Sequence, residues 1–322
     1  MVQFLQKYYV NSNDDFQLWY TEDVLKIILN DDSMLLGIYS DSLLIGVIAS
    51  IPDYYFIRDL NFQKTSEITF LCCHPDYRNK GVAKKLIDEI TKRCLAKQIC
   101  HGFFAGSSLH SQITYANICE AEYYHRPINI KKLFDSNFLD TTLPLNAQIE
   151  YYKINVIESK YSLIKINDVS TIKDIYKLYL SHLKNHTEYC FYQLHSLNYF
   201  IKLLNNKFVF IYGIYEGNIL IDFVIFYMLP LYSNKTNDLI SNAYLYMYTD
   251  NNVKLDLIIY LLLIQLKKLS IDVLTVLKIM NTDNVIMNKM FRFMQGTGKL
   301  FYNSFGFSLD KVNSSQIYKM IV

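Results

Sequence analysis

The segment between residues 67 and 96 constrains the fold most strongly. Glu67–Cys73 is a largely apolar run that predicts a buried strand, and Pro75 ends it. Apolar residues then recur at helical spacing through Val82–Ala96, which predicts an amphipathic helix. The turn Arg78–Ala83 therefore follows a strand and opens a helix.

A turn of this kind is suited to hold a phosphate group. Backbone N–H groups at the start of a helix have no intrahelical acceptor, and the helix dipole makes this end positive. Gly81 lets a ligand approach the backbone closely, while Arg78 and Lys80 add positive charge. The sequence therefore predicts a pyrophosphate site. The pattern R-x-x-G-x-A is short, however, and an ordinary strand-to-helix turn is the alternative.

Strands and helices alternate along the chain in an order that occurs twice. The first part predicts a strand at Phe16–Trp19, a helix capped by Thr21, a hairpin turning at Asp41-Ser42, and the strand–helix–strand unit ending with Ile99–Phe104. A looser region covers residues 105–150. The second part then predicts the strand Leu163–Ile166, a helix capped by Asp168 or Ser170, the strands Phe208–Tyr215, Ile219–Leu229 and Asn242–Tyr248, the helix Leu255–Leu269 and the strand Val273–Leu277.

The tail is predicted to hold a helix over Asn284–Phe293, a turn at Gly296–Gly298 and a final strand pair that ends in Ile317–Val322. A helix that follows a central strand leads to a mixed sheet. We therefore expect an α+β fold with two halves of one topology, residues 1–140 and 141–322.

Composition and charge exclude several classes of protein. Apolar residues make up 51% and charged residues 19%, so a disordered chain is not expected, and a scattered net charge of +2 does not predict a nucleic-acid partner. The longest strongly apolar run, Leu257–Ile264, is too short to span a membrane. We therefore do not expect an integral membrane protein.

The pattern of cysteines indicates the cellular compartment in which the protein is expected. Six cysteines form no C-x-x-C pair, and no apolar segment near Met1 resembles a signal peptide. We therefore expect free thiols, a cytoplasmic protein and, by default, a monomer. The excess of Tyr, Asn, Ile and Lys is typical of an A+T-rich genome, such as that of a parasite or a large DNA virus; a viral protein would work in the host cytoplasm.

No competing catalytic pattern is present. The seven histidines form no H-E-x-x-H motif, and the chain has no G-x-S-x-G elbow. His182 and His186 share an i, i+4 helix face, but no carboxylate lies between them, so a surface pair is favoured and no metal is expected. Cys72 and Cys73 are predicted to be inert strand residues.

Together with the turn, further motifs are spread over nearly the whole chain. They are Glu67–His74, Arg78–Ala83 and Leu86–Arg93; Tyr123–Arg126 with Asn129 and Lys131–Leu133; Tyr9-Val10 with Asp14–Phe16; Gly46–Pro52; Asp222-Phe223 with Phe226-Tyr227 and Leu229-Pro230; and Gly296–Gly298 with Leu300 and Tyr302. Arg78–Ala83 is similar to the coenzyme A signature of the GNAT acyltransferases. As a set, the motifs resemble the protein N-myristoyltransferase family, also called glycylpeptide N-tetradecanoyltransferases.

The resemblance implies two tandem GNAT-like halves in one compact, saddle-like mixed-sheet structure. Residues 1–140 would bind acyl-CoA, while residues 141–322 would bind the peptide and supply a C-terminal carboxylate. The implied reaction is transfer of a myristoyl group from myristoyl-CoA, the co-substrate, to the N-terminal glycine amine of proteins. The backbone amides of Phe70 and Leu71, whose side chains we expect in the core, would form the oxyanion hole. The carboxylate of Val322 would be the base.

The resemblance also implies two sets of binding residues. The acyl-CoA phosphates would be held by Arg78, Asn79, Lys80, Gly81, Val82 and Ala83. The peptide would contact Tyr9, Val10, Phe16, Leu18, Tyr123, His125, Phe138, Tyr227 and Leu300. Any one of these aromatic residues could instead be plain core.

The chain departs from the family pattern at four places. It begins shortly before Tyr9, has Thr297 where the family has an acidic residue, lacks a threonine hydroxyl near Phe104–Gly106, and has Gly81 at a second basic position of the turn. Two other functions therefore stay open: a GNAT-type acyltransferase with another acyl-CoA or amine acceptor, and a non-catalytic relative that binds acyl-CoA or peptide.

Overall fold

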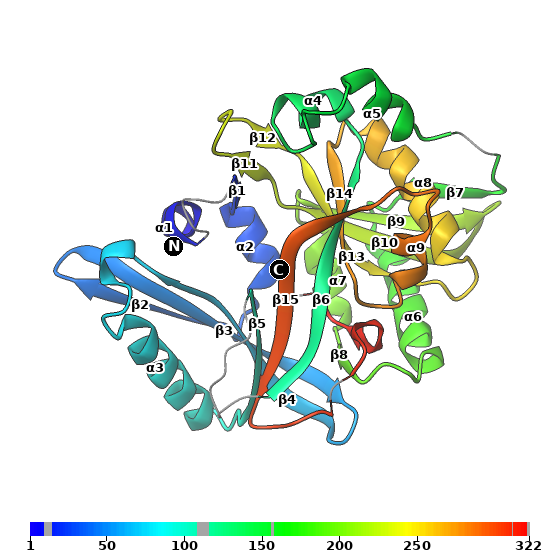
Figure 1. Cartoon of the computed structure of the whole chain (residues 1–322). Coiled ribbons are helices and arrows are strands. Elements are labelled where there is room, and N and C mark those ends of the chain that lie inside the picture. The colour runs from blue at the N-terminus through cyan, green and yellow to red at the C-terminus, as the bar shows by residue number, and fades with distance from the viewer. Residues whose placement is uncertain (10–14, 108–115, 156–157, 311, 321–322) are drawn as a thin grey trace.

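The computed structural model describes residues 1–9, 15–107, 116–155, 158–310 and 312–320. Figure 1 shows one body in which a long, twisted sheet is flanked by helices. The elements of the first part are α1 (Val2–Tyr8), β1 (Phe16–Leu18), α2 (Glu22–Ile28), β2 (Met34–Ser40), β3 (Leu43–Ile57), β4 (Asn61–Cys73), η1 (Pro75–Tyr77), α3 (Val82–Ala96), β5 (His101–Gly106), β6 (Ala116–Pro127), α4 (Ile130–Asp135) and α5 (Leu145–Tyr151).

The second part repeats this alternation. Its elements are β7 (Tyr161–Lys165), α6 (Val169–Asn185), β8 (Phe191–Gln193), α7 (Leu197–Leu204), β9 (Val209–Glu216), β10 (Ile219–Met228), β11 (Leu231–Ser233), β12 (Leu239–Ile240), β13 (Asn242–Tyr248), α8 (Leu255–Lys268), β14 (Val273–Leu277), α9 (Asp283–Met287), β15 (Met294–Phe305), η2 (Ser314–Gln316) and β16 (Ile317–Tyr318).

Local signals explain several helix starts. The Thr21 side chain accepts a hydrogen bond from the Val24 N–H and begins α2, as expected. The Asp168 carboxylate accepts from the Thr171 N–H and begins α6, so Asp168 is the cap and Ser170 is not. Both capping oxygens satisfy donors that the helix itself leaves without an acceptor.

Two units with the same topology make up the repeat. In the first, β4 is followed by α3 and then by β5, which pairs with β4 in parallel. In the second, β13 is followed by α8 and then by β14, again a parallel pair. A helical crossover between parallel neighbours is the expected connection. The predicted repetition of element order is therefore confirmed.

The two halves exchange their last long strands. Among the described residues, a 13-stranded sheet has the order β16-β8-β3-β4-β5-β15-β6-β14-β13-β10-β9-β7, with β2 paired to β3. β15 pairs with β5, and β6 pairs with β14, both antiparallel. β6 and β15 also pair with each other and run side by side through the middle of the molecule (Figure 1). This exchange joins both halves into one sheet.

Three expectations need correction, and one helix was not expected. The region 105–150 is not loose throughout, because it contains the long strand β6. Gly296–Gly298 is not a turn between elements but lies within β15, where its pairing with β6 shifts register. The helix expected over Asn284–Phe293 is only α9, which ends at Met287. The N-terminal helix α1 was not anticipated.

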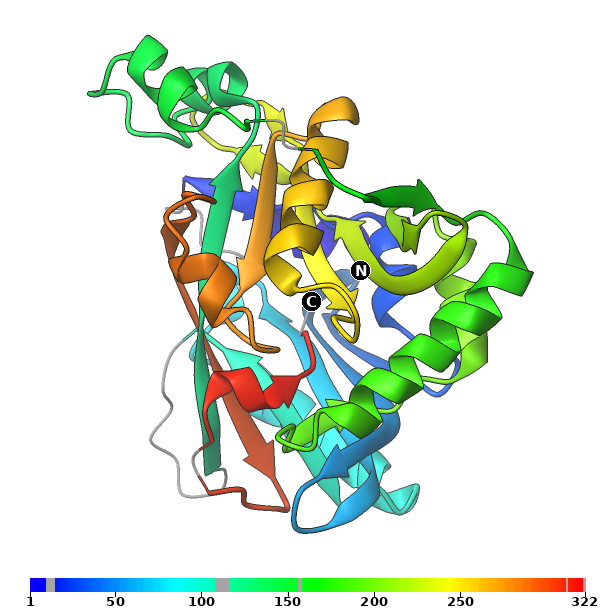
Figure 2. The ribbon, with the colours of Figure 1, turned by 90° about the vertical axis from the view of Figure 1, so that its right-hand side faces the viewer.

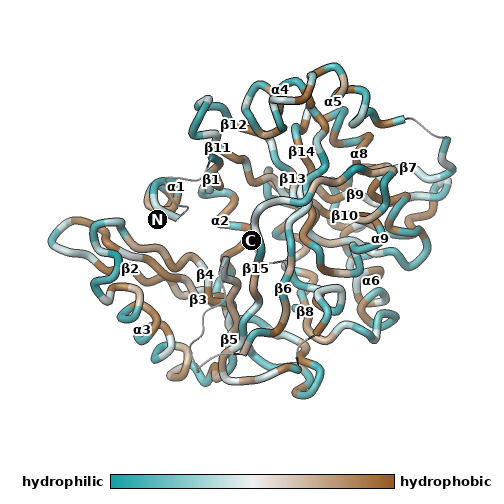
Figure 3. The backbone as a smooth tube through the Cα atoms, viewed as in Figure 1, coloured by the Kyte–Doolittle hydropathy of each residue, from teal (hydrophilic) through white to brown (hydrophobic). Residues whose placement is uncertain are grey.

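The core lies between the sheet and its helices. Hydrophobic residues follow much of β3 and β4 in Figure 3, and all seven residues of β13 are buried. Viewed from the side in Figure 2, α6 and α8 lie over the second half of the sheet. α3 packs on the first half through Val82, Leu86 and Ile90. Within the described ranges, no helix is both long and apolar enough to span a membrane.

Candidate active site

A β-bulge at Phe70 and Leu71 forms the centre of the candidate site. In the antiparallel pairing of β3 and β4, Thr69 pairs with Ala49 and Cys72 with Val47, so two residues of β4 oppose Ile48 alone. Phe70 has a φ of +55°, a left-handed conformation that costs energy for a residue with a side chain. The bulge interrupts the regular ladder of β3 and β4 at Phe70 and Leu71.

The sheet also opens at this point on the other side of β4. The parallel ladder of β4 with β5 covers Thr65, Ser66 and Glu67 in the described structure, and it stops before the bulge. The bulge therefore lies beyond the paired part of β4 and β5. Backbone amides can donate hydrogen bonds to a negatively charged oxygen of a ligand.

The side chains of the bulge differ in environment. Phe70 is fully buried, and its ring lies 5.9 Å from that of Tyr9 and 5.5 Å from that of Tyr20. Leu71 is 39% exposed, so the expectation that both side chains are core is wrong for Leu71. Burial raises the pKa of Tyr9, and hydrogen bonding to Thr69 and to the Phe70 backbone partly offsets that rise. The Tyr9 phenol is therefore at the bulge.

The expected phosphate turn directly follows β4. After the short helix η1, Gly81 is the N-cap of α3 with a φ of +78°, and no side chain caps this helix. A Cβ atom on Gly81 would meet nothing within 4 Å, so open space adjoins the helix start. Asn79 also has a positive φ of 59°. The first N–H groups of α3 therefore face that space without a side-chain acceptor.

The two basic residues of the turn differ in their contacts. Arg78 is exposed, and its guanidinium donates to the Tyr8 backbone oxygen at 3.2 Å and to the Cys73 oxygen at 3.4 Å. Arg78 therefore ties the end of α1 to the end of β4. Lys80 is exposed, with its ammonium group 5.3 Å from the centre of the Tyr77 ring. Val82 is buried and Ala83 is partly buried at the start of α3.

Three of the residues expected to contact the peptide have side chains that contact one another in a row. The ring of Phe16 lies 5.3 Å from that of Phe138, which in turn lies 5.5 Å from the ring of His125. His125 Nδ1 lies 2.9 Å from the Thr275 hydroxyl, which donates to Asn242. Burial lowers the pKa of His125 to about 4, so its ring is neutral at physiological pH.

A second group of expected peptide contacts lies around a different irregularity, the register shift between Gln295 and Lys299 in β15. A Cβ atom on Gly296 would lie 2.6 Å from His125 Nε2, and one on Gly298 would lie 3.3 Å from the Tyr123 ring. A side chain at position 296 would therefore require His125 to shift, whereas one at position 298 would only crowd the Tyr123 ring. Burial raises the pKa of Tyr123, and the nearby phenols of Tyr244 and Tyr9 raise it further.

The other residues expected to contact the peptide do not belong to either of these two groups. Tyr227 is buried, and its ring stacks on Tyr244 at 5.3 Å. Leu18 and Leu300 are partly buried and pack against the core. Val10 and Val322 lie outside the described residues.

A buried ion pair lies on the same strand as the bulge. Lys319 Nζ is 2.9 Å from Glu67 Oε2, and these side chains are 10% and 3% exposed. Lys319 also donates to Gln193 at 2.7 Å. The Lys319 backbone oxygen accepts a hydrogen bond from the Tyr302 hydroxyl at 2.9 Å. The segment after β16 is therefore anchored to β4 close to Phe70.

Sequence reasoning missed several of these residues. Tyr20 contacts both Tyr9 and Phe70 but was not identified among the excess of aromatic residues. The opposite charges of Glu67 and Lys319 within apolar segments were a signal that could have suggested a buried pair. Burial raises the pKa of Cys72 to about 12, which agrees with the expected inert thiol.

The family described as myristoyl-CoA:protein N-myristoyltransferase matches the chain in two parts. Its N-terminal domain matches residues 1–116, and its C-terminal domain matches residues 138–320. Glycylpeptide N-tetradecanoyltransferase from Plasmodium falciparum (isolate 3D7) is 28% identical over 324 residues, which cover 96% of this chain and 76% of that relative.

Solved structures share the fold. N-myristoyltransferase from Saccharomyces cerevisiae with bound myristoyl-CoA matches with a TM-score of 0.84 and 22% identity, covering 100% of this chain and 81% of that one. A GCN5-related N-acetyltransferase from Anabaena variabilis matches with a TM-score of 0.56 and 14% identity, covering 94% and 68% of the two chains. The expected mixed-sheet fold of GNAT type is confirmed. Because the C-terminal match alone covers more than half of the residues, the chain belongs to the myristoyl-CoA:protein N-myristoyltransferase family and is an acyltransferase.

Proposed function

We propose that this chain transfers a myristoyl group from myristoyl-CoA to the N-terminal glycine amine of protein substrates, with its chemistry centred on the bulge in β4. The observation that carries this proposal is the left-handed Phe70 in the bulge, which interrupts the pairing of β4 with β3 just beyond the point where the described pairing of β4 with β5 ends. The helix start at Gly81 lies ten residues after Leu71 in the chain.

The acyl donor, myristoyl-CoA, would be bound both at the bulge in β4 and at the start of α3. The pyrophosphate of the donor would accept hydrogen bonds from the first N–H groups of α3, with Asn79, Lys80 and Gly81 around it. The thioester oxygen would lie against the amides of Phe70 and Leu71. Negative charge develops on this oxygen when the amine attacks, and the loss of one such donor typically costs about 3 kcal/mol of transition-state stabilisation.

In the proposed reaction, the glycine nitrogen forms a bond to the thioester carbon and the carbon–sulfur bond breaks, so CoA leaves as a thiolate. The nitrogen must lose one proton. An α-amine has a pKa of about 7.7–8.0, so a weak base suffices. We assign this base to the carboxylate of Val322, from which the proton passes to the thiolate or to water. Among the described residues, Lys319 leads toward this end of the chain, and its side chain is paired with Glu67 of β4 at 2.9 Å.

The acceptor peptide would lie along the aromatic side chains that the two halves bring together. Tyr9 stands at the bulge, whereas Phe16, Phe138 and His125 form a continuous row further along. Neutral His125 could accept or donate a hydrogen bond without adding a charge to the groove. Tyr123, Tyr227, Leu18 and Leu300 would complete the apolar surroundings.

An acyl-transfer assay tests the proposal directly. The purified chain would be incubated with myristoyl-CoA and a peptide that begins with glycine, and the products would be identified by mass spectrometry. We expect myristoylation of the free glycine amine, and no product with an N-acetylated form of the same peptide. A clear preference for acetyl-CoA, or no transfer from any acyl-CoA, would contradict the proposal.

We also propose that the protein works in the cytoplasm as a monomer. All six cysteines are free, which suits a reducing compartment. Sedimentation equilibrium at micromolar concentration tests the monomer.

A further inference from the structure

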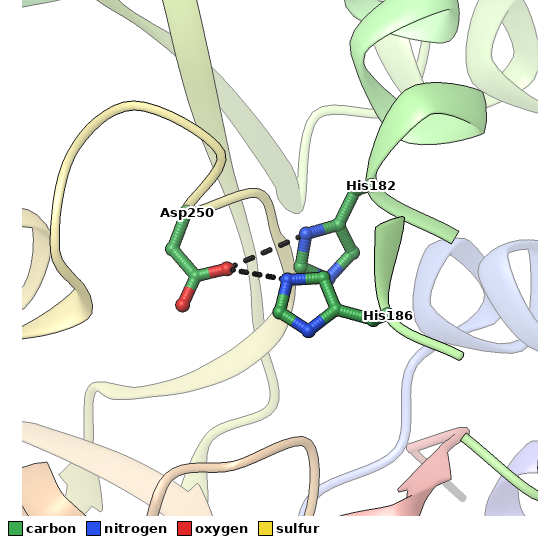
Figure 4. A group of neighbouring side chains, drawn as sticks. All are labelled: His182, His186 and Asp250. Atoms are coloured by element: carbon green, nitrogen blue, oxygen red, sulfur yellow. Dashed lines mark ion pairs between the residues drawn. The ribbon is translucent and has the colours of Figure 1, made fainter. Parts of the chain in front are cut away.

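Two histidines at the end of α6 meet an aspartate from the loop after β13 (Figure 4). Asp250 Oδ1 lies 3.4 Å from His182 Nδ1 and 3.3 Å from His186 Nε2. The candidate ligand atoms of all three residues lie within 4.8 Å of one another. The sequence favoured a surface pair of histidines, but the His182 side chain is completely buried, so that expectation is wrong.

The two separations from Asp250 Oδ1 to the histidine nitrogens are compatible with a tetrahedral metal site. Zn²⁺ binds histidine nitrogen and carboxylate oxygen at about 2.0–2.2 Å, and tetrahedral angles then separate neighbouring ligand atoms by about 3.3–3.6 Å. The two measured separations, 3.4 and 3.3 Å, fall within this range. They are longer than good N–H···O hydrogen bonds. Among the described residues, His182 Nδ1 and Asp250 Oδ1 are buried atoms with no hydrogen-bond partner.

The other ring nitrogen of each histidine has its own partner. His186 Nδ1 lies 2.7 Å from Glu188 Oε1, and His182 Nε2 lies 3.4 Å from the Tyr189 hydroxyl. Metal-binding histidines commonly donate their second N–H to a carboxylate or another acceptor, which fixes the tautomer and the ring orientation. With the protons on those nitrogens, two lone pairs and a carboxylate oxygen face one another. A cation between them would remove this repulsion.

The elements around the group are rigid. The Asp222 carboxylate accepts hydrogen bonds from the backbone N–H groups of Asn251, Asn252 and Val253 at 3.0, 2.8 and 2.9 Å. This fixes the loop that carries Asp250. On the other side, the His186 N–H donates to the His182 backbone oxygen at 3.0 Å and closes the last turn of α6. The backbone that carries the three side chains is therefore hydrogen-bonded on both sides of the group.

We propose that His182, His186 and Asp250 bind a divalent zinc-class metal ion, with water as a further ligand. Two imidazoles and one carboxylate suit Zn²⁺ or Co²⁺, whereas Mg²⁺ and Ca²⁺ prefer oxygen ligands. His186 and Asp250 are 23% and 21% exposed, which leaves a path for the ion and for water.

The proposed role of the ion is structural. It would join the end of α6 to the loop between β13 and α8, beside β16. The His182 ring lies 5.2 Å from the ring of Tyr318 in β16, and the Tyr318 hydroxyl donates to the Tyr248 backbone oxygen at 2.7 Å. Metal binding would therefore stabilise the fold in the region that leads to the C-terminal segment.

Metal titration of the full chain, produced without a polyhistidine tag and stripped with a chelator, tests this proposal. We expect one equivalent of Zn²⁺ to bind and to raise the melting temperature by several degrees, while Mg²⁺ and Ca²⁺ have no such effect. Co²⁺ should give the visible absorption bands of a tetrahedral nitrogen–oxygen site. A chain whose melting temperature does not respond to Zn²⁺, and which gives no Co²⁺ bands, would overturn the proposal.

Substitutions of single residues test whether the metal ion binds at this group of side chains. His186→Gln and Asp250→Asn change partly exposed side chains, and each should weaken Zn²⁺ binding at least tenfold, about the lower bound for loss of a ligand or its outer partner. His101→Gln, which alters a histidine in β5 beside Phe307, is the matched control and should bind as the unaltered chain does. Equal Zn²⁺ affinity in all three variants would place the metal elsewhere and reject the site.

Discussion

The ammonium group of Lys319 lies 2.9 Å from Glu67 Oε2, and both side chains are buried. This ion pair joins the segment after β16 to β4, three residues before Phe70. Burial lowers the pKa of Lys319, but the charge of Glu67 and its hydrogen bond, together with the nearby Tyr246 and Asp53, more than offset this effect, so the pKa is raised and the lysine stays charged. The two features of the proposed reaction centre, the bulge and the C-terminal segment, are therefore linked by one buried contact.

Replacement of Lys319 by methionine should lower the free energy of unfolding by about 3–5 kcal/mol, because Glu67 would remain buried without its partner. The double variant Lys319→Met with Glu67→Leu removes both charges and should recover most of this loss. Urea unfolding of the unaltered chain, both single variants and the double variant gives the coupling energy. A Lys319→Met chain as stable as the unaltered one would show that the pair is not formed.

Replacement of Lys80 by alanine should weaken binding of myristoyl-CoA by about tenfold, the usual size of one lost charge-assisted hydrogen bond. Lys84 is the matched control, because it is also exposed near the start of α3 but pairs with Asp88 at 2.6 Å. Isothermal titration with each variant compares the two. A Lys84→Ala loss as large as that of Lys80→Ala would argue against a phosphate site at the turn.

His125 predicts a pH dependence of stability. In the unfolded chain a histidine takes up its proton near pH 6.5, whereas burial holds the pKa of folded His125 at about 4. Stability should therefore fall as the pH drops from about 6.5 to 4, by about 1.4 kcal/mol per pH unit and about 3 kcal/mol in total. Below pH 4 this contribution should stay constant.

The variant His125→Gln should lack that part of the pH dependence, while His101→Gln should keep it. Urea unfolding at a series of pH values between 4 and 7 measures the slope for each chain. Identical slopes for His125→Gln and the unaltered chain would mean that His125 titrates normally in the folded state.

Features with local signals were predictable from the sequence. Thr21 and Asp168 cap helices through atoms only three residues away. The phosphate turn was equally visible, because a strand, Gly81 and the amphipathic helix α3 follow one another directly. Spacing and residue type suffice when the physical cause is contained in one short segment.

Features that depend on distant partners were not predictable in this way. β6 carries polar residues such as Glu120 and Glu122, and it is a strand because β14 and β15 of the other half flank it. A strand within Ile317–Val322 was expected as part of a final strand pair, whereas β16 covers Ile317–Tyr318 and pairs in parallel with the distant β8. The Glu67–Lys319 pair and the approach of Asp250 to His182 likewise join residues far apart in sequence.

The most direct test of the proposed mechanism is a change of one atom in the terminal carboxylate. Protein ligation can supply the chain with Val322 as a carboxamide, and the same ligation with a free acid is the matched control. We predict that the amide form binds myristoyl-CoA normally but transfers the acyl group about a hundredfold or more slowly in a single turnover, because it has lost its base. Equal transfer rates for amide and acid would contradict the assignment of Val322.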